Sequence, residues 1–373
     1  MTAARGFDVA IVGGGIAGVS AAAEIARTHS VVLLEQEAEL AHHTTSRSAA
    51  IYVESEGGPV FHRLSTASKS FFDESPGADN PLMTPQPVLK VGDASMVDTL
   101  TDEYELGREV TPDLQLVRGD ALTDLCPVLD NSVLSIGILE DSAGSIDVMG
   151  LHQLFLRTAR HHGAQVRRSA KVISARRDDH WYIETAAGPI EATIIVNAAG
   201  AWGDVVAEAC GVAPLGLSPM RRTAFTAPIG HDPSRWPFIY SQTPGLECYF
   251  KPEAGNQLLC SLSEETPSEP MDAKAAELDV ALAIDRIQTI SSLRLRTVKT
   301  AWAGLRTFAP DRNPVFGFDS STDGFLWMVG QGGCGIVTSP AAGKIAGALV
   351  RDAPLPHAVT ELGLSKTDLA PRR

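Results

Sequence analysis

The chain has 373 residues, which is too long for one ordinary domain and suits two that share a core. Hydrophobic residues make up 44% and charged residues 20% of it, as in an ordinary globular protein. Lys and Arg total 31 against 45 Asp and Glu, so the net charge of -14 argues against nucleic acid as a partner.

Membrane, disulfide and metal signals are absent from the sequence. There is no run of about 18 apolar residues and no signal-peptide pattern, so we expect no transmembrane segment and a cytoplasmic location. Neighbouring histidines, His42–His43 and His161–His162, are expected to point apart on regular structure, and we predict no metal site. An odd, scattered set of cysteines argues for a reducing compartment: Cys126, Cys210, Cys248, Cys260 and Cys334.

The first 35 residues predict a βαβ unit. Residues 7–12 form a short apolar run that glycine ends, which is typical of a buried parallel strand. Residues 16–28 are rich in alanine and predict a helix. Residues 31–35 predict the second strand.

A glycine motif joins the first strand to the helix. In GxGxxG, Gly13 makes the tight turn, Gly15 lets the backbone approach a pyrophosphate, and Gly18 lets the helix pack on the strand. The helix N-terminus offers free N–H groups to phosphates. Glu35 ends the second strand, where an acid accepts hydrogen bonds from ribose hydroxyls. Together these features predict a dinucleotide site.

The later segments alternate between strand-like and helix-like patterns. A polar break with Pro and Gly at 73–80 is a plausible domain crossing. We expect the following elements in chain order: an antiparallel meander over 165–185, a strand over 190–197, short strands over 220–262, a helix over 271–291, a strand over 325–329 and a helix over 336–350.

Two of these strands end at glycine-containing loops that suit FAD better than NAD. One strand runs into 198–200, and another runs into the glycine cluster 330–335 before a helix. The second loop would direct a helix N-terminus at an anionic group, and a reduced flavin carries negative charge near its pyrimidine ring. An ordinary strand–helix turn is the alternative for that loop, and an NAD enzyme is the alternative for the dinucleotide site.

A set of motifs along almost the whole chain resembles the D-amino acid oxidase superfamily of flavoproteins, and within it most closely the bacterial D-arginine dehydrogenases. The motifs are GGGIAG at 13–18, HTTSRSAA at 43–50, VNAAGAW at 196–202, PLGLSPMRRTAF at 214–225, YFKPEAG at 249–255, WAGLRTF at 302–308 and GQGGCGI at 330–336.

The resemblance implies an α/β, two-domain, glutathione-reductase-like fold, in which a Rossmann FAD-binding domain carries an inserted antiparallel-sheet substrate domain. The FAD-binding domain would comprise 1–80, 145–219 and 300–373, and the substrate domain 81–144 and 220–299. FAD would be bound non-covalently, because Gly304 stands where sarcosine oxidase relatives carry the cysteine that attaches the flavin.

The residues that the resemblance places against FAD come from the glycine motif, the acid after the second strand, the 43–50 motif and the later loops. They are Gly13, Gly15, Ile16, Ala17, Gly18, Glu35, Gln36, His43, Thr44, Thr45, Ser46, Arg47, Ser48, Ala49, Val172, Ala199, Gly200, Trp202, Arg306, Gly332, Gly333, Gly335, Ile336 and Thr338.

The resemblance also implies a carboxylate clamp at the catalytic site. Arg222, Tyr249 and Arg306 fall on positions that hold the substrate carboxylate in D-arginine dehydrogenases. The role suits their chemistry, because an arginine fork matches a carboxylate in bidentate fashion and a tyrosine hydroxyl adds a bond. The alternative is that Arg222 and Arg306 are salt-bridged scaffold residues.

The side-chain pocket departs from that pattern. Ile51 replaces a histidine, Glu56 replaces a lid tyrosine and Val88 replaces the acid that binds a guanidinium; Gly333 also falls in the substrate pocket. An apolar Val88 would leave a buried guanidinium unpaired, so we expect neutral or apolar side chains to be preferred. Glu56 either holds an amine or is solvated on a mobile loop.

The predicted reaction is oxidation of the C–N bond of an amino acid, with a hydride moving from Cα to flavin N5 and the imino acid hydrolysing to a keto acid. One alternative is a flavin oxidase or demethylase of secondary amines or N-substituted amino acids. Another is a non-catalytic FAD-binding subunit of a larger complex. The substrate, its stereochemistry and the electron acceptor, oxygen or another carrier, stay open.

Overall fold

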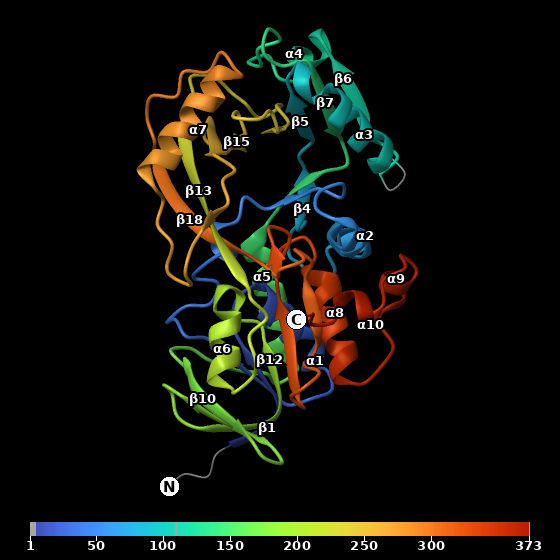
Figure 1. Ribbon diagram of the computed structural model, residues 1–373, viewed down its shortest axis with the longest axis vertical. Helices are drawn as coiled ribbons and strands as arrows, with labels where there is room; N and C mark the ends of the chain where they lie inside the picture. Colours follow the sequence, from blue (N-terminus) through green and yellow to red (C-terminus); the bar gives the residue numbers. More distant parts are fainter. Residues whose placement is uncertain (1–4, 109–110, 373) are drawn as a thin grey trace.

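The computed structural model describes residues 5–108 and 111–372, and Figure 1 shows two regions stacked along the long axis of the molecule. The lower region contains the N-terminal strand and the central helices, and the upper region contains a second sheet with its own helices. Two long strands, β13 (Ser218–Pro228) and β18 (Thr300–Phe308), run from one region toward the other.

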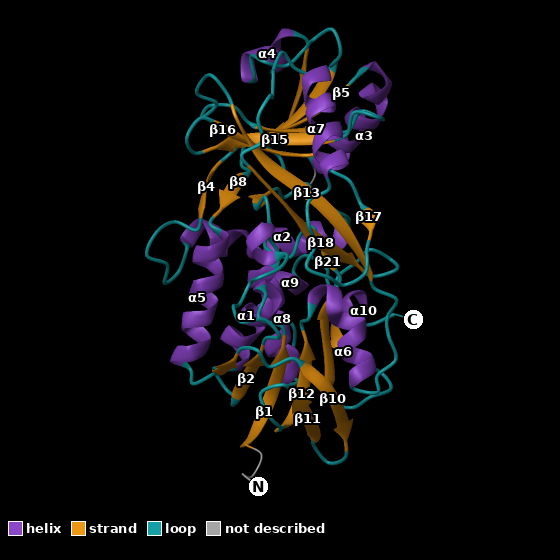
Figure 2. Cartoon of the chain, turned by 90° about the vertical axis from the view of Figure 1, so that its left-hand side faces the viewer, coloured by secondary structure: helices purple, strands orange, loops and turns teal. Residues whose placement is uncertain are grey.

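The lower region is built on a largely parallel sheet, because its central strands are apolar on both faces. The order is β10 (Val172–Arg177), β11 (Trp181–Thr185), β12 (Ile190–Asn197), β1 (Arg5–Val12), β2 (Val31–Leu34) and β9 (Gln165–Arg167), with β20 (Phe325–Val329) beside β12 and β19 (Val315–Phe318) beside β20. Helices α1 (Ile16–Ile25), α5 (Val148–His161) and α8 (Ser339–Val350) pack together, α1 between the other two (Figure 2).

The upper region is built on a mostly antiparallel sheet, with β14 and β5 as its parallel pair among the described strands. The order is β21 (Gln331–Gly332), β18, β13, β16 (Gln257–Ser261), β15 (Cys248–Glu253), β14 (Phe238–Ser241), β5 (Val88–Gly92), β7 (Ile136–Glu140) and β6 (Gln115–Arg118), with β17 (Thr266–Pro267) beside β13. Phe225, Ile239 and Phe250 on one face pack with α7 (Glu277–Thr289) in a buried core. The opposite face is therefore left for the site.

Smaller elements complete the chain. A short sheet of β3 (Ile51–Tyr52), β8 (Gly144–Ile146) and β4 (Met83–Pro85) lies between the two regions. The remaining helices are α2 (Pro59–Glu74), α3 (Val97–Gly107), α4 (Asp120–Leu125), α6 (Gly203–Ala209), α9 (His357–Thr360) and α10 (Lys366–Leu369). None of the helices in the described ranges is long and apolar enough to cross a membrane.

The α/β fold class and the βαβ start are confirmed, and several boundaries are corrected. Gln165–Arg167 is not part of an antiparallel meander, because β9 pairs in parallel with β2. The helix expected over 271–291 begins at Glu277, and the one expected over 336–350 begins at Ser339, where Pro340 suits a first turn. Helix α2 extends to Glu74, inside the predicted break. The domain boundaries stay a prediction, although β18, which follows the boundary at 300, pairs in the upper sheet.

Candidate active site

The glycine motif forms a tight loop between β1 and α1. Gly13 has φ 111°, a conformation that favours glycine, and a Cβ there would collide with the Ala198 carbonyl. A Cβ at Gly18 would overlap the carbonyl oxygen of Gly13, so the third glycine does permit the close packing of helix and strand. Gly15 caps α1, whose first turn carries no acidic residue, so the positive end of the helix faces the loop.

Hydrogen bonds from other elements hold this loop in place. The Glu35 carboxylate accepts from the Gly14 N–H at 2.8 Å. His152 on α5 donates from Nε2 to the Gly14 carbonyl at 2.9 Å, and burial lowers the pKa of its imidazole, which favours the neutral ring. The Thr45 hydroxyl accepts from the Ile16 N–H at 3.0 Å. The N–H and the carbonyl of Gly14 are thus both held by side chains, and His152 is a site residue that the sequence motifs do not reveal.

A cleft opens beside the loop. Many residues predicted to contact FAD line it, namely Gly13, Gly15, Glu35, Gln36, His43, Thr44, Thr45, Val172, Ala199, Gly200 and Trp202. Ile16, Ala17 and Gly18 lie just behind, in the first turn of α1. A glycine cradle, a helix N-terminus and an acid at the end of β2 are the features that a dinucleotide needs, so the residues present fit FAD.

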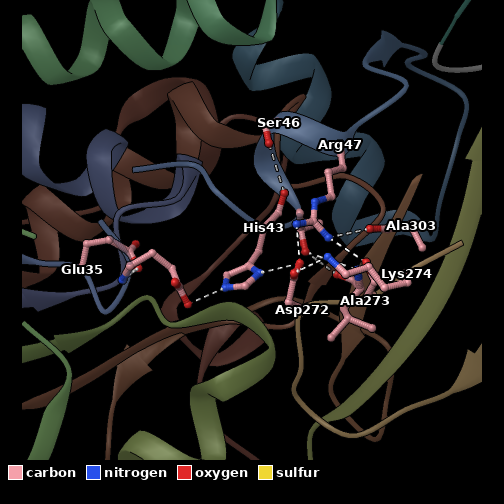
Figure 3. Close-up of polar contacts among 11 residues, drawn as sticks. Glu35, His43, Ser46, Arg47, Asp272, Ala273, Lys274 and Ala303 are labelled. Carbon is pink, nitrogen blue, oxygen red and sulfur yellow. Dashed lines mark hydrogen bonds and ion pairs between the residues drawn. The ribbon is translucent and has the colours of Figure 1, made fainter. Parts of the chain in front are cut away.

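The 43–50 segment runs from this cleft toward the upper sheet and is tied to it (Figure 3). The Thr44 hydroxyl donates to the Leu305 carbonyl at 2.8 Å, and Trp302 Nε1 donates to the Arg47 carbonyl at 3.0 Å. The Arg47 guanidinium bonds to Asp272 and to the carbonyls of 273 and 303. The side chain of Arg47 therefore links the 43–50 segment to residues 272–273 and 303. Ser46, Ser48 and Ala49 continue along the same segment.

The adjacent histidines differ from expectation. His42 and His43 lie in a turn, and their rings meet edge to face with centroids 4.8 Å apart. His43 Nε2 donates to the Glu37 carboxylate at 3.1 Å, and one ligand-type atom from each of Glu37, His42 and His43 lies within 4.8 Å of the others. The rings of His161 and His162, at the end of α5, also lie edge to face, with centroids 5.2 Å apart, so the expectation that the rings point apart is wrong for both pairs; the absence of a metal stays a prediction.

The glycine cluster after β20 joins the two regions. Gly332, with φ 52°, pairs with Thr307 on β18, and Gly335 lies against Ile16 at the start of α1. A Cβ at Gly333 would lie 3.0 Å from Arg306 Nη1. Ile336 is buried and the Thr338 hydroxyl donates to the Cys334 carbonyl at 2.9 Å. Burial raises the pKa of the Cys334 thiol to about 12, so this sulfur is neither a base nor a nucleophile at neutral pH.

One face of the upper sheet carries a row of polar side chains in register. Tyr240 pairs with Lys90 on one side and with Tyr249 on the other. The row continues through Ser261 and Ala224 to Trp302, which bonds the 43–50 segment. Because side chains alternate along a strand, Arg222 lies on the same face as Ala224.

Two guanidinium groups converge at the end of this face. Strands β13 and β18 pair Met220 with Arg306 and Arg222 with Gly304. Arg222 and Arg306 therefore lie on the same face of neighbouring strands. Burial and the charge of Arg306 lower the pKa of Arg222 to about 10. The Arg306 guanidinium makes no hydrogen bond or ion pair with any residue of 5–108 or 111–372. Two neighbouring cations, one without a partner, are an arrangement that is able to bind an anion.

The loop after β16 completes the surroundings of Arg222. Its Nε donates to the Glu264 carbonyl at 2.8 Å and its Nη1 to the Ser263 hydroxyl at 3.3 Å. Glu265 lies 3.7 Å away. Ser263 has φ 64°, a strained conformation for a residue other than glycine, of the kind that clusters at functional sites. Arg222 is therefore held in place with part of its donor capacity left over.

The predicted pocket residues do come together. Val88 and Tyr249 belong to one small apolar cluster with Phe238, against which Ala49 and Ile51 pack. Glu56 lies 3.9 Å from Lys90, and its loop is held by the buried carboxylate of Glu140, which accepts from the N–H groups of 54 and 55. Lys90 and Tyr240 were missed in the sequence, although Lys90 follows Val88 by two residues and shares its face of the strand.

Comparisons with known proteins agree with this geometry. The profile of the family described as FAD dependent oxidoreductase, DAO, matches residues 8–349, and the chain belongs to that family. FAD is its cofactor, as predicted.

Individual relatives are distant. Glycine oxidase of Geobacillus kaustophilus is 24% identical over 92% of this chain and 93% of its own, and its crystal structure superposes with a TM-score of 0.85 over 99% of both chains at 20% identity. Human mitochondrial dimethylglycine dehydrogenase is 28% identical over 55% of this chain and 24% of its own. An FAD-bound L-alpha-glycerophosphate oxidase from Mycoplasma pneumoniae has a TM-score of 0.84 at 16% identity, over 93% of this chain and 95% of its own. Since that enzyme's named substrate is not an amine, the fold alone does not identify the substrate.

Proposed function

We propose that this chain oxidises a C–N bond of an α-amino acid, either at Cα or, in an N-substituted amino acid, at the carbon of the N-substituent. The observation that carries the proposal is the pair Arg222 and Arg306, two converging guanidinium groups of which the second has no partner among the described residues. A substrate carboxylate would neutralise both charges and make a bidentate contact. Gly333, in the glycine cluster that follows β20, lies against the Arg306 side chain, so the proposed anion site is next to a cofactor loop.

Each residue has a role in this proposal. Arg222 and Arg306 bind the carboxylate, and the Tyr249 hydroxyl adds a hydrogen bond from the neighbouring row. Ile51 and Val88 form an apolar wall that excludes water from the carbon to be oxidised. FAD, when bound, would supply the two-electron oxidant for that carbon. The amine loses its proton to solvent, since no general base is needed for a neutral amine to react.

Primary and secondary amines are both candidates. The motif resemblance to D-arginine dehydrogenases supports D-amino acids as the first class to test, and the likeness to glycine oxidase and dimethylglycine dehydrogenase supports N-substituted glycines. The carboxylate clamp serves both classes. The carboxylate is either on the carbon that is oxidised or on another substituent of the same nitrogen.

An anaerobic screen of D-, L- and N-methyl amino acids for bleaching of the flavin absorbance tests the proposal. We expect at least one class to bleach the flavin of the purified chain, with a keto acid as the product of a primary amine and an aldehyde as the product of demethylation. A flavin that no amino acid bleaches would instead favour the non-catalytic subunit.

A further inference from the structure

Lys90 is a charged residue of the site face to which the proposed reaction assigns no role. Its side chain is 14% exposed, although its strand is otherwise apolar on both faces. It lies at one end of the polar row, beside Tyr240, and Arg222 and Arg306 lie toward the other end. The face thus carries a cation at each end, with the tyrosines 240 and 249 between them.

Two carboxylates surround the Lys90 ammonium, and they are not equivalent. Glu103 on α3 accepts a hydrogen bond at 2.9 Å. Glu56 lies 3.9 Å away, at the limit of an ion pair, with no other direct polar partner for its carboxylate in the described ranges and a side chain that is 46% exposed. Burial works against the charge of Lys90, but Glu56 and Glu103 raise its pKa above the ordinary value, so the ammonium persists.

Between Lys90 and the two arginines, the strands of this face contribute cations and hydroxyl groups, while Glu253 farther along β15 is paired with Lys251. Arg222 and Arg306 at one end and Lys90 at the other are cations, and the hydroxyl of Tyr240 lies within electrostatic range of both Arg222 and Lys90. Glu56 and Glu103 come from a loop and a helix at the rim. A ligand that covers this face must therefore supply acceptors at two separate places.

We propose that Lys90 and Tyr240 form a second anion subsite, and that the substrate is a dicarboxylic amine, meaning an amino acid with an acidic side chain or an N-carboxyalkyl amino acid. This inference rests on the proposed function, because Arg222 and Arg306 must bind the first carboxylate. It replaces the preference for neutral or apolar side chains that Val88 predicts, because Lys90 adds a cation to the same face of the sheet. The second carboxylate takes the place that Glu56 occupies beside Lys90.

The exchange conserves charge around Lys90. Glu56 leaves for solvent as the substrate carboxylate enters, and Glu103 keeps its hydrogen bond. The loop suits this movement, since Gly57 has φ 92° and Gly58 follows it, while the Glu140 carboxylate holds the preceding N–H groups of 54 and 55. Glu56 is therefore a gate for the subsite, and binding of a cationic side chain by Glu56 is the competing outcome.

The test compares paired substrates and unreactive ligands on the FAD-loaded enzyme. The substrates are D-glutamate, D-aspartate and iminodiacetate against D-leucine, D-arginine and sarcosine, scored by kcat/KM. The ligands are glutarate against butyrate, scored by the shift in Tm, which requires no turnover. Both comparisons are repeated with Lys90→Met and with Glu56→Gln.

We expect dicarboxylic substrates to win by roughly ten- to hundredfold, as one charge-assisted contact allows. Lys90→Met should lower that ratio by a similar factor and remove the advantage of glutarate over butyrate. Lys90→Arg should restore part of both, and Glu56→Gln should keep the preference. Lys251→Met is the matched control. Lys251 on β15 is also buried, lies on the same face of the sheet as Lys90, and pairs with Glu253 at 2.8 Å. It should keep the wild-type ratio.

Three results would overturn the inference. The first is a preference for D-arginine that Glu56→Gln abolishes. The second is equal use of mono- and dicarboxylic substrates, which leaves the proposed function intact. The third is loss of the dicarboxylate preference in Lys251→Met but not in Lys90→Met. If no amine bleaches the flavin while glutarate still binds through Lys90, the proposed function fails by itself and the anion subsite stands as a binding site.

Discussion

The cofactor loops satisfy their polar groups in a different way from the substrate face, the face of the upper sheet that carries Lys90, Arg222 and Arg306. Around the glycine motif, Glu35, Thr45 and His152 fix the backbone with hydrogen bonds of 2.8–3.0 Å that exist without any ligand. On the substrate face, Arg222 has donors to spare and Arg306 has no partner in the described part of the chain.

Binding at the cofactor loops therefore depends on shape, and binding at the substrate face depends on charge. The backbone of the cofactor cleft is held in position before any ligand binds. We therefore expect cofactor binding to be lost when a substitution shifts this backbone or creates a steric clash. On the substrate face, Arg306 has no partner among the described residues and Arg222 meets Glu265 only at 3.7 Å, so we expect binding there to depend on the charge of the ligand.

The largest effect is expected from Gly18→Ala. A Cβ at this position would overlap the carbonyl of Gly13, and no flexible side chain is there to move aside. Helix α1 would have to shift, at about 1–3 kcal/mol or more, and the phosphate loop with it. We expect the purified variant to lack flavin absorbance. Gly6→Ala on the preceding strand β1, where a Cβ meets nothing within 4 Å, should stay yellow; a yellow Gly18→Ala would contradict the account.

Arg222→Ala and Arg306→Ala should be the next largest. Removing a donor from a buried charge pairing costs about 2–5 kcal/mol, so kcat/KM should fall on the order of a hundredfold or more while FAD stays bound. Arg221→Ala is the control, because that residue points to the other face and pairs with Asp279 at 3.0 Å. Wild-type kinetics in either clamp variant would remove that arginine from the site.

The same division explains what the sequence could predict. The βαβ unit, the tight turn at Gly13 and the close packing at Gly18 follow from local rules, and they are found as expected. The parallel pairing of β9 was out of reach, because strand partners are set by long-range packing. Lys90 was within reach, since strand alternation places it beside Val88 on one face, but Glu103 and Glu56 join it from segments that only the fold brings together.

A smaller effect is expected from pH at His152. Burial lowers its pKa below the ordinary value of 6.5, so its stabilising contribution is complete above pH 6.5 and is lost as the pH falls. FAD should therefore dissociate more readily at pH 5.5 than at pH 7.5, by several fold. His152→Gln keeps a donor for the Gly14 carbonyl and should show a flatter profile. Identical pH profiles, measured by fluorescence of released FAD, would rule out this role.

The mildest prediction concerns attachment of the cofactor. Gly304 stands where a linking cysteine would be required, and the raised pKa of Cys334 keeps that thiol protonated. Acid precipitation should leave all the yellow colour in the supernatant. Colour retained in the pellet would show a covalent bond to the flavin.

The central claim is that Arg222 and Arg306 recognise a substrate carboxylate, and one two-by-two measurement tests it most directly. The kcat/KM of the best amino acid is compared with that of its decarboxylated amine, in the wild-type enzyme and in Arg306→Ala. We predict that the wild type favours the amino acid on the order of a hundredfold or more, and that the variant brings the two substrates to within severalfold of each other. A variant that keeps the wild-type ratio would contradict the account.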